Sequence, residues 1–182
     1  MRVFGIPLPC QRGELERDFN GPMLIRTLTE RDIPVWLALA HESDDVVLGL
    51  KRNLTVFYEG FDEYMERKIM QEEAFKAVDE ESGKCLGIVA FSSNHNRISF
   101  IGVSKAVDFH EVGSRLMEFA FSRLDNAREI TAKIIKSDAR MIEQERALYE
   151  RFNFKESDVK LEENGVPVIQ MKKNPRKTTG VR

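Results

Sequence analysis

Two segments of the 182-residue chain carry residue types and spacings that could do chemistry. In the first, an apolar run ends at Val103, a loop follows, and Gly113 and Ser114 open a run with helical spacing. The first turn of a helix presents unpaired N–H groups and the positive end of the helix dipole, which together bind phosphates. Gly113 would let a phosphate approach the backbone, and Ser114 could add a hydroxyl donor. We therefore expect a diphosphate site here, although such a strand, loop and helix are also common architecture.

The loop before this helix carries charges of both signs. Lys105, His110 and Arg115 are cations suited to diphosphate oxygens. Asp108 and Glu111 lie among them, and a carboxylate beside a diphosphate is unfavourable. If the phosphates bind to backbone N–H groups, we expect these two carboxylates to point away.

The second segment is a helical pattern that carries Tyr149. Residues 147–154 read Ala-Leu-Tyr-Glu-Arg-Phe-Asn-Phe. Asn153 stands where a helix end needs a left-handed residue, and Asn is the best substitute for Gly in that conformation. Taken alone, the segment is equally well explained as an amphipathic helix with Tyr149 and Phe152 in the core.

The first segment resembles the acetyl-CoA-binding motif of the GNAT superfamily of N-acyltransferases. That motif is a strand ending in Val, then R/Q-x-x-G-x-G/A, then a helix with Leu. Val103, Gly113 and Leu116 match it, whereas Asp108 replaces the Arg or Gln and Glu111 replaces the first glycine.

The second segment resembles the second signature of the same superfamily, A-x-x-LYEKLGF. Leu148, Tyr149, Glu150 and Phe154 match. Arg151 replaces Lys conservatively. The other departures are Phe152 for Leu, Asn153 for Gly and, upstream, Glu145 for Ala and Ile142 for Asn. The resemblance covers about residues 23–171.

The resemblance implies an enzyme that moves an acetyl group from acetyl-CoA directly to a primary amine of a small molecule or peptide. Tyr149 matches the tyrosine that protonates the departing thiolate, and pKa values of about 10 and about 8.5 allow that proton exchange. The backbone of Ile101 and Val103 would pair with the pantetheine arm. The cofactor-binding residues implied are Ile101, Val103, Phe109, His110, Glu111, Val112, Gly113 and Ser114.

The base that would take the amine proton is not evident from the sequence. Glu72, Glu73, His41 and His95 are candidates, and a water chain to solvent is an equal alternative. In the resembled family, acceptor specificity comes from the loop between the first two helices and from the last hairpin.

An acidic run lies in that first loop, which we place at about residues 41–53. Glu42, Asp44 and Asp45 could attract a cationic amine or could simply be solvated. A different class of function also stays open: a non-catalytic acyl-CoA sensor, or an interaction module that keeps the fold.

Hydrophobic periodicity predicts strands at 23–29, 74–79, 85–91, 97–103 and 129–135, and two short strands around residues 164–165. It predicts helices at 33–40, 54–69, 112–124 and 142–152. Antiparallel hairpins followed by a β-α-β crossover give an α/β (α+β) fold with a mixed sheet and helices on both faces. The resemblance implies about seven mostly antiparallel strands, splayed at a central parallel pair.

The chain is expected to comprise an N-terminal extension (1–22), an acyltransferase domain (23–171) and a basic tail (172–182). Its net charge of −2 gives no bias toward nucleic acid or membranes, and no apolar run is long enough to span a bilayer.

Cys10 and Cys85 have no metal-type spacing, and the three histidines form no metal-type pair. We therefore expect no metal, two free thiols and a cytoplasmic location. A homodimer formed through an edge strand stays open.

Overall fold

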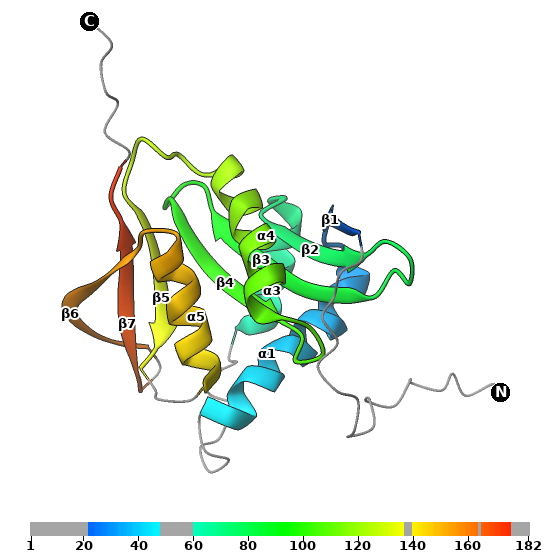
Figure 1. Cartoon of the computed structure of the whole chain (residues 1–182), viewed down its shortest axis with the longest axis horizontal. Coiled ribbons are helices and arrows are strands. Elements are labelled where there is room, and N and C mark those ends of the chain that lie inside the picture. The colour runs from blue at the N-terminus through cyan, green and yellow to red at the C-terminus, as the bar shows by residue number, and fades with distance from the viewer. Residues whose placement is uncertain (1–21, 48–59, 137–139, 164, 176–182) are drawn as a thin grey trace, which may run out of the picture.

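A single mixed sheet organises the computed structural model, which describes residues 22–47, 60–136, 140–163 and 165–175. Its strand order is β1-β2-β3-β4-β5-β7-β6, and every neighbouring pair is antiparallel except the parallel pair of β4 and β5 (Figure 1). The strands are β1 (Met23–Thr27), β2 (Ala74–Asp79), β3 (Cys85–Ser92), β4 (Arg97–Val103), β5 (Ile130–Ile135), β6 (Lys155–Glu163) and β7 (Val166–Lys173).

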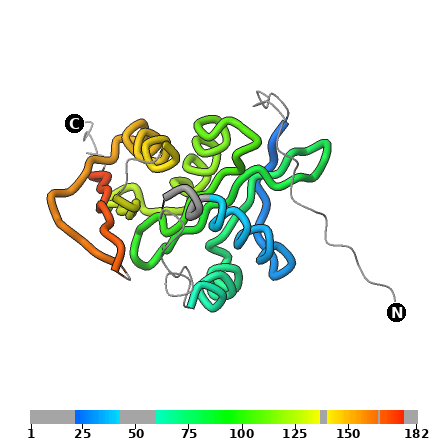
Figure 2. Tube along the Cα trace, turned by 90° about the horizontal axis from the view of Figure 1, so that it is seen from below, coloured from blue at the N-terminus to red at the C-terminus, as the bar shows by residue number. Residues whose placement is uncertain are grey.

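Helices cover both faces of this sheet. They are α1 (Ile33–Val47), preceded by a 3-10 turn (Glu30–Asp32), α3 (Phe61–Met70), α4 (Phe109–Arg123) and α5 (Arg140–Arg151). Figure 2 shows α4 and α5 on one side of the sheet and α1 and α3 on the other. The predicted fold class is therefore confirmed, together with the predicted order of strands and helices.

Each face of the sheet has its own hydrophobic core. Val89 belongs to the core that includes Leu116 and Met117 of α4, whereas its neighbour Ile88 belongs to the core that includes Trp36 of α1 and Met65 of α3. Because β3 is covered on both faces, it is apolar at successive positions, as buried strands usually are. This double covering fixes the position of β4, which pairs with β3 from Arg97 to Val103 except at one bulge.

Several sequence-based boundaries differ from the structure. The acidic run of Glu42, Asp44 and Asp45 was expected in a loop, but α1 continues through it to Val47. The second predicted helix begins, in the described residues, at Phe61, and its earlier part at 54–59 lies outside them. At the other end, β7 continues through Lys172 and Lys173, the first two residues of the predicted basic tail.

No helix in the described part of the chain is long and apolar enough to cross a membrane.

Candidate active site

The two parallel strands at the centre of the sheet separate almost where they begin. In the described residues, β4 and β5 pair only at Arg97 and Thr131. The pairing between β3 and β4 shifts by one residue at Ser99, which is opposite no residue of β3. Such a bulge bends the strand locally. The edge of β4 from this bulge to Val103 therefore faces β5 without a strand ladder between them.

The buried side chain of Asn96 holds the closed end of this gap. Its amide nitrogen donates to the carbonyls of Asp125 and Glu129, both at 2.9 Å, and its amide oxygen accepts from the Asp125 N–H at 2.9 Å. The Thr131 N–H donates to the Asn96 carbonyl at 3.2 Å. The φ of Asn96 is 48°, a left-handed conformation that Asn tolerates better than most residues. This one residue thus ties the turn before β4 to the loop before β5.

The N-terminus of α4 lies at the other end of β4 and is capped by its own acid. Asp108 is the N-cap, and its carboxylate accepts the Glu111 N–H at 2.7 Å. The Val112 N–H donates to the Asp108 carbonyl at 3.3 Å. Helix geometry therefore leaves the N–H groups of Phe109 and His110 without acceptors in the helix. The Asp108 side chain therefore occupies one of the amides that were expected to bind a phosphate.

Gly113 has a different role from the one predicted for it. It is buried, and a Cβ at this position would lie 2.8 Å from Cδ2 of Leu148 on α5. The missing side chain therefore allows α4 and α5 to approach each other, and this packing role is separate from the predicted one of making room for a phosphate. Ser114, the next residue, does line a cleft.

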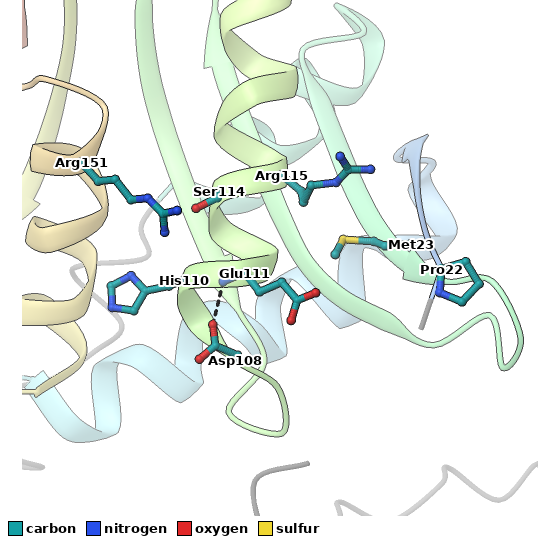
Figure 3. Close-up of a pocket in the computed structure, with 8 residues that line it drawn as sticks. All are labelled: Pro22, Met23, Asp108, His110, Glu111, Ser114, Arg115 and Arg151. Atoms are coloured by element: carbon teal, nitrogen blue, oxygen red, sulfur yellow. Dashed lines mark hydrogen bonds between the residues drawn. The ribbon is translucent and has the colours of Figure 1, made fainter. Parts of the chain in front are cut away.

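That cleft, of about 650 Å³, runs over the N-terminal half of α4 (Figure 3). His110 and Arg151 lie on one side of the helix near Ser114, whereas Glu111 and Arg115 point toward the other side. The Ser114 hydroxyl oxygen is buried and has no hydrogen-bond partner in the described structure. A buried hydroxyl without a hydrogen-bond partner is unfavourable, so a ligand oxygen in this cleft that accepts a hydrogen bond from Ser114 would be stabilised. Arg151 also lines this cleft, a position that was not predicted from the sequence.

Tyr149 lies on the buried face of α5 and is only 1% exposed. Its ring meets the ring of Phe154 edge-on, with centroids 5.1 Å apart. Burial raises its pKa well above the usual value, and the nearby Glu145 and Tyr64 raise it further. The phenol is therefore protonated throughout the neutral range.

Tyr64 connects this region to the bulge in β4. Its hydroxyl donates to the Ser99 hydroxyl at 2.7 Å. Burial raises the pKa of Tyr64 to about 12, so this phenol is also a permanent donor. Tyr64 additionally packs against Trp36 of α1, with ring centroids 5.9 Å apart, and stacks on Phe61 at 5.7 Å.

Glu145 is the second titratable residue on the buried face of α5. It is half-buried and lies one helical turn before Tyr149, on the stripe that also holds Ile142. Burial raises the pKa of Glu145 to about 8, so its carboxyl is largely neutral at pH 7. The sequence shows the signal directly, because a glutamate interrupts the apolar stripe that ends at Tyr149.

The candidate bases are not gathered around Tyr149. Glu73 binds Lys68 at 2.5 Å and the Ser93 N–H at 2.6 Å. Although burial opposes its ionisation, these hydrogen bonds lower the pKa of Glu73, which suits a structural ion pair better than a proton acceptor. Glu72 and His95 are exposed beyond the ends of α3 and β3. His41 is half-buried on α1.

The remaining predicted site residues lie along β4 and the first turns of α4. Ile101 and Val103 are buried and pair with Val89 and Gly87 of β3, so their opposite backbone edge faces the gap. Val112 is buried in the core, and Phe109 is half-buried against it. The described residues contain no group of three or more His, Cys, Asp or Glu side chains that could hold a metal ion.

Solved structures with the same fold cover most of this chain. PaiA N-acetyltransferase from Thermoplasma acidophilum, in complex with coenzyme A, is 14% identical, with a TM-score of 0.62 over 84% of this chain and 99% of its own. A GNAT-family acetyltransferase from Bacillus cereus is 16% identical, with a TM-score of 0.58 over 86% and 100%. Spermidine N-acetyltransferase from Vibrio cholerae, in complex with CoA and spermine, is 16% identical, with a TM-score of 0.53 over 84% and 95%.

At these identities, the structural matches establish the fold alone. A sequence comparison with curated proteins gave no match. The model of the acetyltransferase (GNAT) domain family, by contrast, matches residues 39–175, which include β4, the N-termini of α4 and α5, and Tyr149. The chain therefore belongs to the GNAT acetyltransferase family.

Proposed function

We propose that this protein transfers an acetyl group from acetyl-CoA directly to a primary amine, with Tyr149 as the acid that protonates the CoA thiolate. The observation that carries the proposal is the unpaired edge of β4 between Ser99 and Val103. It lies inside a sheet, where unpaired N–H and C=O groups need partners. The pantetheine arm, with its two amides, can supply such partners in the manner of an added strand.

The N-terminus of α4 would hold the diphosphate. The N–H groups of Phe109 and His110 and the buried hydroxyl of Ser114 are the donors that support this role. Arg151 and the His110 side chain, on the same side of α4, add contacts for phosphate oxygens. The Asp108 carboxylate opposes binding, both because it is an anion and because it occupies the Glu111 N–H.

In the chemical step, the neutral amine attacks the thioester carbonyl carbon and the carbon–sulfur bond breaks. The Tyr149 phenol gives its proton to the leaving sulfur, and the proton lost from the amine passes to water or to a base. Burial makes Tyr149 a weaker acid, but the same burial raises the pKa of a thiolate beside it. The two groups thus stay matched closely enough for proton transfer.

The acceptor is a primary amine of a small molecule or a peptide. The family to which the chain belongs and the spermine in the related Vibrio cholerae structure support an amine acceptor. Within this chain, the rings of Trp36, Phe61, Tyr64 and Phe100 gather on the face of β4 opposite α4. Aromatic rings attract cationic groups, so this face is where we place the approach of the amine.

Replacing Tyr149 by Phe tests the proposal. We expect turnover, measured as CoA thiol release with a panel of amines, to fall by about 100-fold, because a positioned general acid contributes at least that much. Binding of acetyl-CoA, measured by thermal shift, should change little. Tyr64→Phe removes the other buried phenol, on the face where we place the amine, and so tests the approach of the amine instead of the acid role.

Three other outcomes would contradict parts of the proposal. Unchanged turnover in Tyr149→Phe would exclude Tyr149 as the acid. A thermal shift with acetyl-CoA but no thiol release with any amine would favour the non-catalytic sensor. A wild-type protein without any shift in millimolar acetyl-CoA would contradict both functions, since ligand at 100 times Kd stabilises a protein by about 2.7 kcal/mol.

A further inference from the structure

A carboxyl group lies where the proposed site would bring the uncharged part of its co-substrate. The stripe of α5 that faces the sheet consists of Ile142, Glu145 and Tyr149, spaced by three and four residues. Ile142 and Tyr149 are buried, and Glu145 between them is half-buried. Nothing in the fold itself accounts for a glutamate on this stripe, since the residue forms no ion pair recorded in the described structure.

The direction of the elements places Glu145 relative to the gap. α5 begins shortly after the C-terminal end of β5 and packs back along it, and α4 begins shortly after the C-terminal end of β4. Both helix N-termini therefore lie at the open end of the gap. A ligand running from the N-terminus of α4 toward Tyr149 would pass Glu145 about 6 Å earlier, the rise of four residues in a helix.

We propose that Glu145 binds the pantetheine arm of acetyl-CoA through its neutral carboxyl group and so makes the affinity for acetyl-CoA depend on pH. This inference rests on the proposed function. A neutral carboxyl has an O–H donor and a C=O acceptor, so it can bind the C=O or the N–H of a secondary amide. A carboxylate lacks the donor, and removing it from water under the uncharged pantetheine arm costs desolvation free energy.

Other titratable and charged groups lie on α5 and on the elements packed against it. Tyr149 interacts with Glu145 and with Tyr64. Both tyrosines have raised pKa values and stay protonated. Among charged residues of the elements packed against α5, Lys133 on β5 binds Glu163, and Glu42 on α1 accepts the Lys105 N–H at 3.3 Å. His41 on α1 and His110 on α4 also lie on these elements.

The sign of the effect follows from the raised pKa of about 8. Below this pH the carboxyl is neutral and competent to bind, and above it the group ionises and binding weakens. If only the neutral form binds, the Kd for acetyl-CoA rises about tenfold between pH 7 and pH 9. Acetyl-CoA is the suitable probe because it has no free thiol that would titrate in this range.

The experiment is a calorimetric titration of the full chain with acetyl-CoA at pH 7, 8 and 9. Adenosine 3′,5′-bisphosphate, a nucleotide without the arm, is titrated in parallel. We expect the tenfold rise for acetyl-CoA in the wild type, a nearly flat profile for Glu145→Gln, and a flat profile for the nucleotide in both proteins. Gln keeps a donor and an acceptor but cannot ionise.

Three results would overturn the inference. The first is an equal rise of Kd with pH in the wild type and in Glu145→Gln. The second is the same rise with the nucleotide, which would place the titrating group at the phosphates. The third is a Glu145→Ala variant that binds acetyl-CoA at pH 7 as tightly as the wild type. A different result is a wild type that binds neither the nucleotide nor acetyl-CoA at any of the three pH values. That result would contradict the proposed function, and this inference with it.

Discussion

The two ends of the gap between β4 and β5 are built in opposite ways. At the closed end, the buried Asn96 side chain makes three hydrogen bonds of 2.9 Å, and the strands pair. At the open end, the hydroxyl of Ser114 is buried and has no hydrogen-bond partner among the described residues, and Asp108 accepts only one N–H of the first turn of α4. The closed end is therefore organised for stability, and the open end has hydrogen-bonding capacity left for a ligand.

The largest effect should come from breaking the closed end with Asn96→Ala. The substitution leaves three backbone groups, on Asp125 and Glu129, without their partner, and Ala is less suited than Asn to a positive φ. At about 1 kcal/mol for each hydrogen bond, we expect the free energy of unfolding to fall by about 3 kcal/mol, measured by urea denaturation.

A matched control for this variant is Asn126→Ala. The half-buried Asn126 amide donates to the carbonyls of Phe121 and Leu124 near the end of α4, away from the paired strands. We expect a loss of about 1 kcal/mol in total there, less than for each bond of Asn96, because water can replace the amide of a half-buried residue. Equal losses at the two positions would show that Asn96 is an ordinary turn residue.

A smaller effect is expected between the two ends, where α4 meets α5. Gly113→Ala places a methyl group 2.8 Å from Cδ2 of the buried Leu148, which must shift. Overpacking of this kind costs about 2 kcal/mol of unfolding free energy. Ser114→Ala is the control in the same helix turn, and it should be nearly neutral because the Ser114 hydroxyl makes no hydrogen bond within the described part of the chain. A neutral Gly113→Ala would mean that the two helices separate readily.

The smallest change in stability, with an opposite change in binding, is expected at the open end. Asp108→Ala removes an N-cap and should lower the free energy of unfolding by about 1 kcal/mol. The same variant frees the Glu111 N–H and removes a negative charge, so acetyl-CoA should bind several-fold more tightly in calorimetry. Asp108→Asn keeps the cap and isolates the effect of charge. Weaker binding by both variants would show that Asp108 contacts the ligand favourably.

The sequence predicts the fold well because its signals are local and periodic. The order of strands and helices is confirmed, and Asn153 has the left-handed conformation expected of it, with φ of 64°. The end of α1 was placed too early because His, Ser, Asp and Val are weak helix formers, although α1 packs against α5 and β4 and continues to Val47. Here tertiary packing overrides local propensity.

Parts of the site could not be predicted, for a different reason. Asn96 looks like one polar residue among several in a turn, and its partners at Asp125 and Glu129 are about thirty residues away. The contact of Gly113 with Leu148 could not be predicted, because a glycine in a motif does not show which way its missing side chain would point. Glu145 could have been found, since its place on the stripe of Tyr149 follows from helical spacing alone.

The position of the unpaired β4 edge also bears on how the protein behaves at high concentration. An open edge at the border of a sheet can recruit a strand from another molecule and so begin aggregation. The edge of β4 that faces the gap lies instead in the middle of the strand order, with β1, β2 and β3 on one side and β5, β7 and β6 on the other. A strand from another molecule would have to lie about 4.8 Å from both β4 and β5. It could not pass through the gap, because β4 and β5 pair at Arg97 and Thr131. A fold of this kind can keep unsatisfied backbone groups available without exposing them to its neighbours.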